Sequence, residues 1–173
     1  MNLTTSQKVF WLALGVAVLL FAGCPYGSEY PLGSPADAVA DSALLGTWMT
    51  PQASDEDFTL TIRGSGAGEY LLLAESPDEK EPESFRAFVS TVDGEKFLNI
   101  RDEEWILVNY RVSGDLLQLR LVDDELFESR TFASPEDLRA FVRQNLADPR
   151  LYGGQKEGDW DWDWVLERGG PGT

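Results

Sequence analysis

Short runs in which apolar and polar side chains alternate, separated by turn residues, fill residues 46–132. This pattern restricts most strongly what the chain can fold into. In the run 57–63 (DFTLTIR), Phe58, Leu60 and Ile62 alternate with polar residues, which is the period-two pattern of a strand with one apolar face. Asp93-Gly94 separates two such runs and favours a tight hairpin, because both residues tolerate positive φ. The pattern predicts eight strands, at 46–50, 57–63, 69–75, 84–92, 96–101, 105–112, 116–122 and 126–132.

The period of the pattern changes after the eighth run. In 134–146 (SPEDLRAFVRQNL), apolar residues recur at helical spacing on one face, Ser134 is a good N-cap and Pro135 suits the first turn. We expect a helix over 134–146 that packs through this apolar face. A further alternating run (DWDWDWVL) predicts a final strand near 159–166, and the glycine-rich 169–173 is typical of a disordered tail.

Eight short, antiparallel-looking strands favour a closed barrel over an open sheet, because closure removes the edges that short strands would otherwise expose. The predicted fold is all-β with one packed helix: a small eight-stranded antiparallel up-and-down barrel, forming one domain over 46–168. The length of 173 residues fits a single such domain. A barrel of eight strands is just wide enough either to be filled by side chains or to hold one small ligand.

The face that the strands turn inward stays open at this stage. In 105–112 (WILVNYRV), Trp105, Asn109 and Arg111 share one face. If this face points inward, these residues and Gln118 and Arg120 of the next strand would line a partly polar cavity. If it points outward, the barrel is filled with aliphatic side chains. Periodicity leaves both arrangements open, because the outcome depends on the register of the strands.

An uncharged apolar run occupies residues 9–22, after a short polar start whose only charged side chain is Lys8. The 14 residues of this run are too few to span a bilayer as a helix, which takes about 20, so the run indicates a signal peptide over 1–23. The residues that follow, Phe21-Ala22-Gly23-Cys24, resemble the lipobox of bacterial lipoproteins, whose signal peptidase cuts before a cysteine that is then lipidated. The resemblance implies a lipidated Cys24, and as the only cysteine it has no partner for an intrachain disulfide.

A lipid on Cys24 makes the membrane the first expected partner. Several acyl chains, each contributing about 0.8 kcal/mol per buried CH₂, hold a protein firmly on a bilayer. Residues 24–45 are predicted to be the lipidated cysteine and a tether, because 25–35 are rich in Pro, Gly and Ser. Pro25 follows the cysteine where enterobacterial lipoproteins retained in the inner membrane carry Asp. We therefore expect a cell-envelope protein, outside the cytoplasm and on the outer membrane where the envelope has two.

The domain itself resembles the lipocalin family. Gly46-Thr47-Trp48 matches the Gly-x-Trp signature of that family on its first strand, and strands, helix and final strand follow in the family's order. The resemblance implies that Trp48 packs across the closed end of the barrel against an arginine near the end of the last barrel strand. Arg130 is the residue that fits this role if 126–132 is the last barrel strand. The resemblance also implies a binding module and not a catalyst.

Composition excludes several function classes. With 14 Lys and Arg against 30 Asp and Glu, the formal charge is −16, which disfavours a nucleic-acid partner. The absence of His removes Ser-His-Asp and Cys-His mechanisms and the usual zinc ligand sets. Acidic clusters at 55–57, 78–79, 102–104 and 123–125 fall in predicted turns, where charge keeps strand ends soluble. We expect no catalytic residues, and hence no enzyme.

Three aspartates in the final run are spaced like the first ligands of a calcium-binding loop, but the rest of the run does not fit such a loop. Asp159, Asp161 and Asp163 alternate as the first ligands of a calcium loop do. Such a loop next requires Gly, where Trp164 stands, and an acid at its twelfth position, where Gly170 stands. We expect a solvated acidic face and neither a metal nor a cofactor.

The tryptophans of the same run share its other face. Trp160, Trp162 and Trp164 either line an apolar pocket or seal the outside of the barrel, and burial is the commoner use of such rings. The candidate ligand or packing residues are Trp48, Trp105, Arg111, Arg120, Arg130, Trp160, Trp162 and Trp164. The expected function is non-catalytic binding of an apolar or amphipathic small molecule. The alternative is a structural or assembly role, in which a filled barrel binds a protein partner of the envelope.

Overall fold

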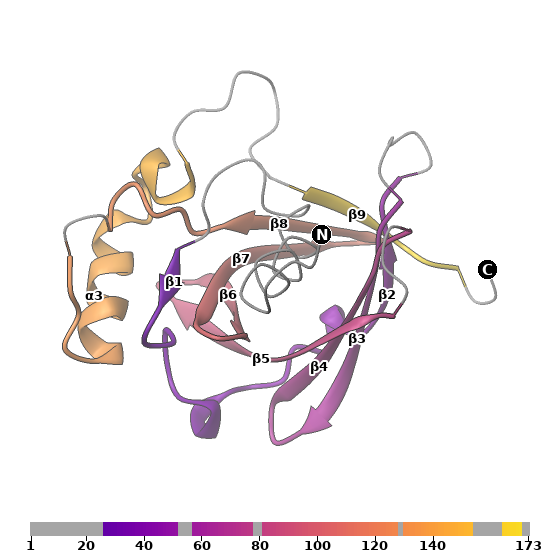
Figure 1. Cartoon of the computed structure of the whole chain (residues 1–173), viewed down its shortest axis with the longest axis horizontal. Coiled ribbons are helices and arrows are strands. Elements are labelled where there is room, and N and C mark those ends of the chain that lie inside the picture. Colours follow the sequence, from indigo (N-terminus) through magenta and orange to yellow (C-terminus); the bar gives the residue numbers. More distant parts are fainter. Residues whose placement is uncertain (1–25, 52–56, 78–80, 128–129, 154–163, 171–173) are drawn as a thin grey trace, which may run out of the picture.

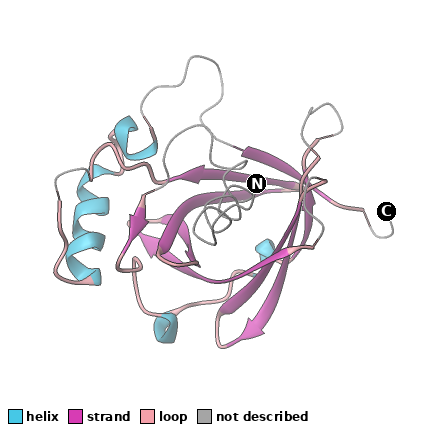
Figure 2. Ribbon diagram, viewed as in Figure 1, coloured by secondary structure: helices cyan, strands magenta, loops and turns pink. Residues whose placement is uncertain are grey.

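The computed structural model describes residues 26–51, 57–77, 81–127, 130–153 and 164–170 (Figure 1). Its strands are β1 (Gly27–Ser28), β2 (Gly46–Met49), β3 (Thr59–Gly66), β4 (Glu69–Glu75), β5 (Glu83–Val92), β6 (Glu95–Arg101), β7 (Trp105–Ser113), β8 (Leu116–Leu121) and β9 (Trp164–Arg168). One α-helix, α3 (Pro135–Asn145), is joined by the short 3₁₀ helices η2 (Pro35–Asp37), η3 (Ser42–Leu44) and η4 (Pro149–Tyr152). Strands make up the largest share of the described chain, and α3 stands outside their ring (Figure 2).

Strands β2 to β9 form a closed antiparallel ring in which each strand pairs with the next in sequence. The ring closes because β9 pairs on one side with β2, where Trp48 opposes Arg168, and on the other with β8, where Leu117 opposes Leu166. Asp93 (φ 48°) and Gly94 (φ 93°) form the expected tight hairpin between β5 and β6. The predicted eight-stranded up-and-down barrel is therefore confirmed, with β1 as an extra strand outside the ring.

The eighth strand of the ring is not the one that the pattern indicated. The described residues of the predicted run 126–132 form a turn and no strand, and β9 takes the closing position instead. The reason is packing: Phe127 and Phe132 lie outside the barrel against Phe141 of α3, with ring centroids 5.0 and 5.5 Å from it. A run of alternating apolar residues can thus form a packed loop as well as a strand.

Helix α3 forms as predicted. The Ser134 side chain caps it by accepting a hydrogen bond from the Asp137 backbone N–H at 3.3 Å, and Pro135 begins the first turn. Leu138, Phe141 and Val142 are buried on its inner face. Among the described residues, no helix is both long and apolar enough to cross a bilayer.

The period of two in each strand divides the apolar side chains between two cores. The barrel core lies inside the ring and includes Trp48, Leu72 and Leu98. The outer core lies between the outside of the ring and α3, and includes Phe97, Leu107 and Val142. Neighbouring residues on one strand, such as Phe97 and Leu98 of β6, thus belong to different cores.

The segment 26–45, predicted as a tether, is instead packed against the barrel from Tyr26 onward. Leu32 and Leu44 are fully buried, and β1 pairs with the beginning of β7. The Leu32 backbone N–H donates to Oδ1 of the buried Asn99 at 2.7 Å. Composition indicated a flexible linker, but a few apolar residues and one buried amide fasten this segment.

The arginine that lies on Trp48 is Arg168, not Arg130. The Arg168 guanidinium sits 4.1 Å from the centre of the Trp48 ring and donates to the carbonyls of Ala43 and Leu45 at 3.1 and 2.9 Å. Arg130 lies instead over Phe141 of α3, at 4.4 Å. The assignment of Arg130 followed from taking 126–132 as the last barrel strand, and it moves to Arg168 because β9 is that strand.

We predict that Arg168→Ala destabilises the barrel by about 1–2 kcal/mol, since it removes a cation–π contact and two hydrogen bonds to backbone carbonyls. The matched variant Arg130→Ala removes one exposed cation–π contact and should cost only about 0.5 kcal/mol. Urea unfolding of both variants, followed by tryptophan fluorescence, measures the difference. Equal losses for the two arginines would contradict a special role for the Arg168–Trp48 contact.

Candidate functional site

A cavity of about 100 Å³ lies inside the barrel and is lined by apolar side chains alone. Every strand from β3 to β9 contributes to its wall, because the inward residues at this level of each strand are apolar. The lining residues are Leu44, Phe58, Leu60, Ile62, Leu72, Ala74, Phe85, Leu98, Ile100, Ile106, Val108, Leu119, Leu121 and Trp164. Such a lining offers dispersion contacts and removal of apolar surface from water, and no hydrogen bond that would orient a polar group.

The cavity lies toward one end of the barrel. Phe58 precedes β3, Ile106 is near the start of β7, and Leu121 is the last residue of β8, so all three belong to the end of the ring opposite the hairpins β5–β6 and β7–β8. We call this the cavity end and the other the closed end. The acidic turn 102–104 connects β6 to β7 at the cavity end, and its three residues are exposed.

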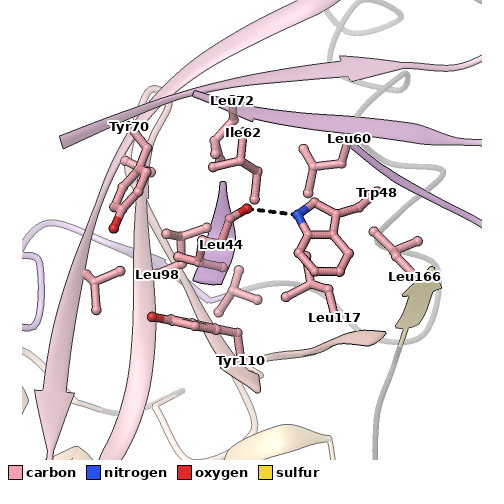
Figure 3. Packing of buried hydrophobic residues seen from close by; sticks show 13 residues of the cluster. Leu44, Trp48, Leu60, Ile62, Tyr70, Leu72, Leu98, Tyr110, Leu117 and Leu166 are labelled. Atoms are coloured by element: carbon pink, nitrogen blue, oxygen red, sulfur yellow. Dashed lines mark hydrogen bonds between the residues drawn. The ribbon is translucent and has the colours of Figure 1, made fainter. Parts of the chain in front are cut away.

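Side chains fill the closed end. Figure 3 shows Trp48 lying among Leu44, Leu60, Leu117 and Leu166, and its indole N–H donates to the Leu44 carbonyl at 2.8 Å. Trp48 is fully buried, so this hydrogen bond satisfies a polar group that would otherwise be costly inside the barrel. Leu44 and Leu60 belong to both this packing and the cavity lining, so they form the floor between the two.

A polar cluster lies at the closed end, centred on Asp41. Its carboxylate accepts hydrogen bonds from the Tyr110 hydroxyl at 2.9 Å and from Lys96 Nζ at 2.6 Å. The Tyr70 hydroxyl bonds to the Asp41 backbone, accepting from its N–H and donating to its carbonyl. Asp41 therefore joins three strands of the barrel to the segment just before η3, and holds that segment across the closed end.

These contacts shift the pKa of each partner. Burial would raise the pKa of Asp41, but hydrogen bonds from Lys96, Tyr110 and the Ala43 N–H outweigh it, so the pKa lies below its ordinary value. Burial, reinforced by the hydrogen bond to the Asp41 carboxylate and by its charge, raises the pKa of Tyr110 far above its usual range. Tyr110 thus stays a neutral donor and Asp41 a charged acceptor at neutral pH.

The register answers the question that the sequence left open. The partly polar face of β7 and β8, which carries Asn109, Arg111 and Arg120, points outward. Ile106 and Val108 line the cavity, so Trp105 and Arg111 lie outside, and Arg111 is exposed. Trp105 packs against Phe88 with an edge-to-face geometry at 5.5 Å, beneath the Arg101 guanidinium. Neither Trp105 nor Arg111 belongs to the cavity lining.

Arg120 also lies on the outer face, in a buried polar network. Its Nη2 donates to Asn109 Oδ1 at 3.0 Å, and its guanidinium sits 3.6 Å from the centre of the Tyr152 ring. Asn109 is fully buried and donates to the Lys96 carbonyl at 3.0 Å. The network attaches η4, which carries Tyr152, to the outer wall of the barrel, and Arg120 does not belong to the cavity lining.

Of the predicted tryptophan face, Trp164 is the member that the structure describes, and it lines the cavity. Trp160 and Trp162 lie outside the described residues, as does Cys24. Among the residues that the structure describes, no group of three carboxylate or thiol side chains could hold a metal ion.

The sequence interpretation missed the residues that close the barrel: Asp41, Tyr70, Tyr110 and Arg168. Tyr70 and Tyr110 carried a usable signal, because each stands on the apolar face of its strand and a buried phenol requires a partner. Asp41 and Arg168 carried none that a single sequence reveals, since one acid among 30 gives no sign of being buried.

Comparisons of the chain with protein-family models, with curated proteins and with solved structures found no match. What the barrel does is therefore inferred from its own residues.

We predict that Asp41 stabilises the fold above its ordinary pKa of 3.8 and that this contribution is lost in acid. Because the folded pKa is depressed, the stabilisation is fully present above about pH 5 and disappears as the pH falls through 3.8 toward the lower folded value. Unfolding free energies of the wild type and Asp41→Asn, measured between pH 7 and pH 2, should therefore differ at pH 7 and converge in acid. Asp37→Asn, at an exposed site in η2, is the control. A pH-independent difference for Asp41→Asn would contradict the role of its charge.

Proposed function

We propose that this protein is a lipid-anchored envelope lipoprotein whose barrel binds an apolar or amphipathic small molecule without catalysis. The observation that carries the proposal is the cavity, because its lining contains only apolar side chains and it lies at one end of a closed barrel. An apolar lining can take up a hydrocarbon or aromatic group but holds no acid, base or nucleophile for a reaction.

The size of the cavity limits what it can take up. About 100 Å³ is close to the 150 Å³ engineered apolar cavities that stay dry and bind benzene, so one aromatic ring or a short stretch of acyl chain is the expected fit. A polar head group would lie at the cavity end, outside the apolar lining. The ligand is thus expected to be amphipathic or wholly apolar, with its apolar part inside the barrel.

The sequence supplies the rest of the proposal. The lipobox-like Phe21-Ala22-Gly23-Cys24 supports an acylated Cys24, and Gly46-Thr47-Trp48 with Arg168 stacked on Trp48 supports the resemblance to lipocalins. With Lys8 removed in the signal peptide, the processed chain carries 13 basic against 30 acidic side chains. Charge therefore disfavours binding of the protein to an anionic membrane surface, and the lipid on Cys24 would be the anchor. The outer membrane is the proposed location where the envelope has two membranes.

A structural role with a protein partner is the second candidate. The observation that favours it is the filled closed end, where Trp48, Tyr70 and Leu117 occupy much of the interior and leave a small cavity. Native mass spectrometry of the protein purified from its own envelope separates the two candidates. A stoichiometric adduct that extracts into organic solvent supports ligand binding, whereas a clean mass favours the filled barrel and a protein partner.

We predict that filling the cavity weakens ligand binding and leaves the barrel folded. Ala74→Phe places a ring into the cavity from β4. It should weaken binding of the neutral apolar dye N-phenyl-1-naphthylamine, whose phenyl ring has the size that the cavity takes, at least about tenfold, or ~1.4 kcal/mol. Leu73→Phe, on the outward face of the same strand, is the matched control and should bind as the wild type does. Dye fluorescence measures affinity and circular dichroism checks the fold. Equal dye binding by both folded variants would place the dye outside the barrel.

A further inference from the structure

The chain is fastened to the barrel from Tyr26 onward, beside the cavity. The Tyr26 backbone N–H donates to the Val122 carbonyl at 3.0 Å, and Val122 directly follows Leu121 of the cavity lining. Gly27 then pairs with Ile106, which also lines the cavity, and Ser28 pairs with Trp105. At the cavity end, β1 thus takes the position beside β7 that β8 occupies farther down the strand.

Side chains and further hydrogen bonds secure the same segment. The Tyr26 ring stacks on Phe127 with centroids 3.9 Å apart. The fully buried Leu32 donates to Asn99 Oδ1 at 2.7 Å, and its carbonyl accepts from Arg139 Nη1 at 2.8 Å. Residues 26–32 are therefore fixed to the barrel at several points, and they do not act as a flexible tether.

Chain length limits how far a lipid on Cys24 can be from this wall. Cys24 precedes Tyr26 by two residues, and two residues span at most about 7 Å. The closed end is farther away: Ser113 follows Ile106 by seven residues along β7, or about 24 Å at the rise of an antiparallel strand. An acyl group on Cys24 would thus be attached nearer to the cavity than to the closed end.

Building on the lipid anchor and the apolar binding of the proposed function, we propose that the lipidated chain has no free tether and docks on a lipid bilayer in one orientation. The wall formed by β1, the start of β7 and the turn 102–104 faces the bilayer, and the closed end points away. An apolar molecule then has a short path between the bilayer and the cavity.

Charge sets how closely this wall approaches the lipid. Asp102, Glu103 and Glu104 are exposed in the turn and repel anionic head groups. At physiological salt this repulsion is screened beyond about 8 Å, so it does not overcome an anchor of several acyl chains. The wall therefore lies beside the head groups and is not inserted among the acyl chains.

Quenching by lipid in nanodiscs tests this orientation. The lipoprotein, processed in the cell and purified from membranes, carries a fluorescent amino acid in place of either Glu103 or Leu116, which is an exposed residue at the closed end. The bilayer is phosphatidylcholine with a fraction of head-group spin-labelled lipid. Quenching at position 103 should exceed quenching at position 116 severalfold.

A second pair of samples tests whether the fastening at Tyr26 is the cause. Insertion of about twelve Gly and Ser residues between Pro25 and Tyr26 restores a flexible tether and should make quenching at the two positions nearly equal. Equal quenching without the insertion, stronger quenching at position 116, or a difference that survives the insertion would each overturn the inference.

The result is separable from that of the ligand-binding proposal. Mass spectrometry of the same purified protein reports acylation of Cys24, and an unmodified cysteine would overturn both the anchor and this orientation while dye binding in the barrel could still be measured. Conversely, failure of Ala74→Phe to affect dye binding would overturn ligand binding in the cavity and leave the quenching difference unaffected.

Discussion

The pairing of β9 with both β2 and β8 is the interaction on which the rest of the structure depends. Its inward residues act at three levels of the barrel: Trp164 lines the cavity, Leu166 belongs to the barrel core, and Arg168 lies on Trp48 at the closed end. Without β9, β2 and β8 would each expose an edge and the cavity would lack one wall. Five residues therefore complete the backbone hydrogen bonding, the apolar interior and the closure of one end.

Most of the polar side chains that are buried in the described part of the chain have partners in the structure. Asp41, with Tyr110 and Lys96, closes one end, while Asn99 and Asn109 connect elements on the outside of the ring. The cavity wall has no such group, so a ligand there gains free energy by removing apolar surface from water and not by a directed hydrogen bond. Selectivity in such a site comes from shape and volume, and this is the physical basis on which we propose a binding role for the barrel.

Local patterns predicted the strands and the helix of this fold. They did not predict which strand closes the ring, because that depends on long-range pairing. Alternation located the first seven ring strands and, over the described residues 164–166, the strand that became β9, and helical spacing with Ser134 as cap located α3. The run 126–132 shows the limit: its aromatic residues suit a strand or a packed loop, and only the pairing of β9 with β2, over 100 residues earlier, shows which strand closes the ring. The error of choosing Arg130 over Arg168 followed from that one ambiguity. The inward face of β7 was undetermined for the same reason, since register is not a local property.

The segment 26–45 shows why composition misled, and it is part of the folded unit. Its Pro, Gly and Ser content resembles a linker on average, but its few apolar and capping residues act at specific places. Tyr26 fastens it at the cavity end, Leu32 fixes it to Asn99 on the outer wall, and Asp41 and Leu44 close the opposite end. One continuous segment therefore runs along the barrel from one end to the other. Because the closed end is completed by residues that precede β2, the folded unit includes the described segment from Tyr26 to Leu45 as well as the ring.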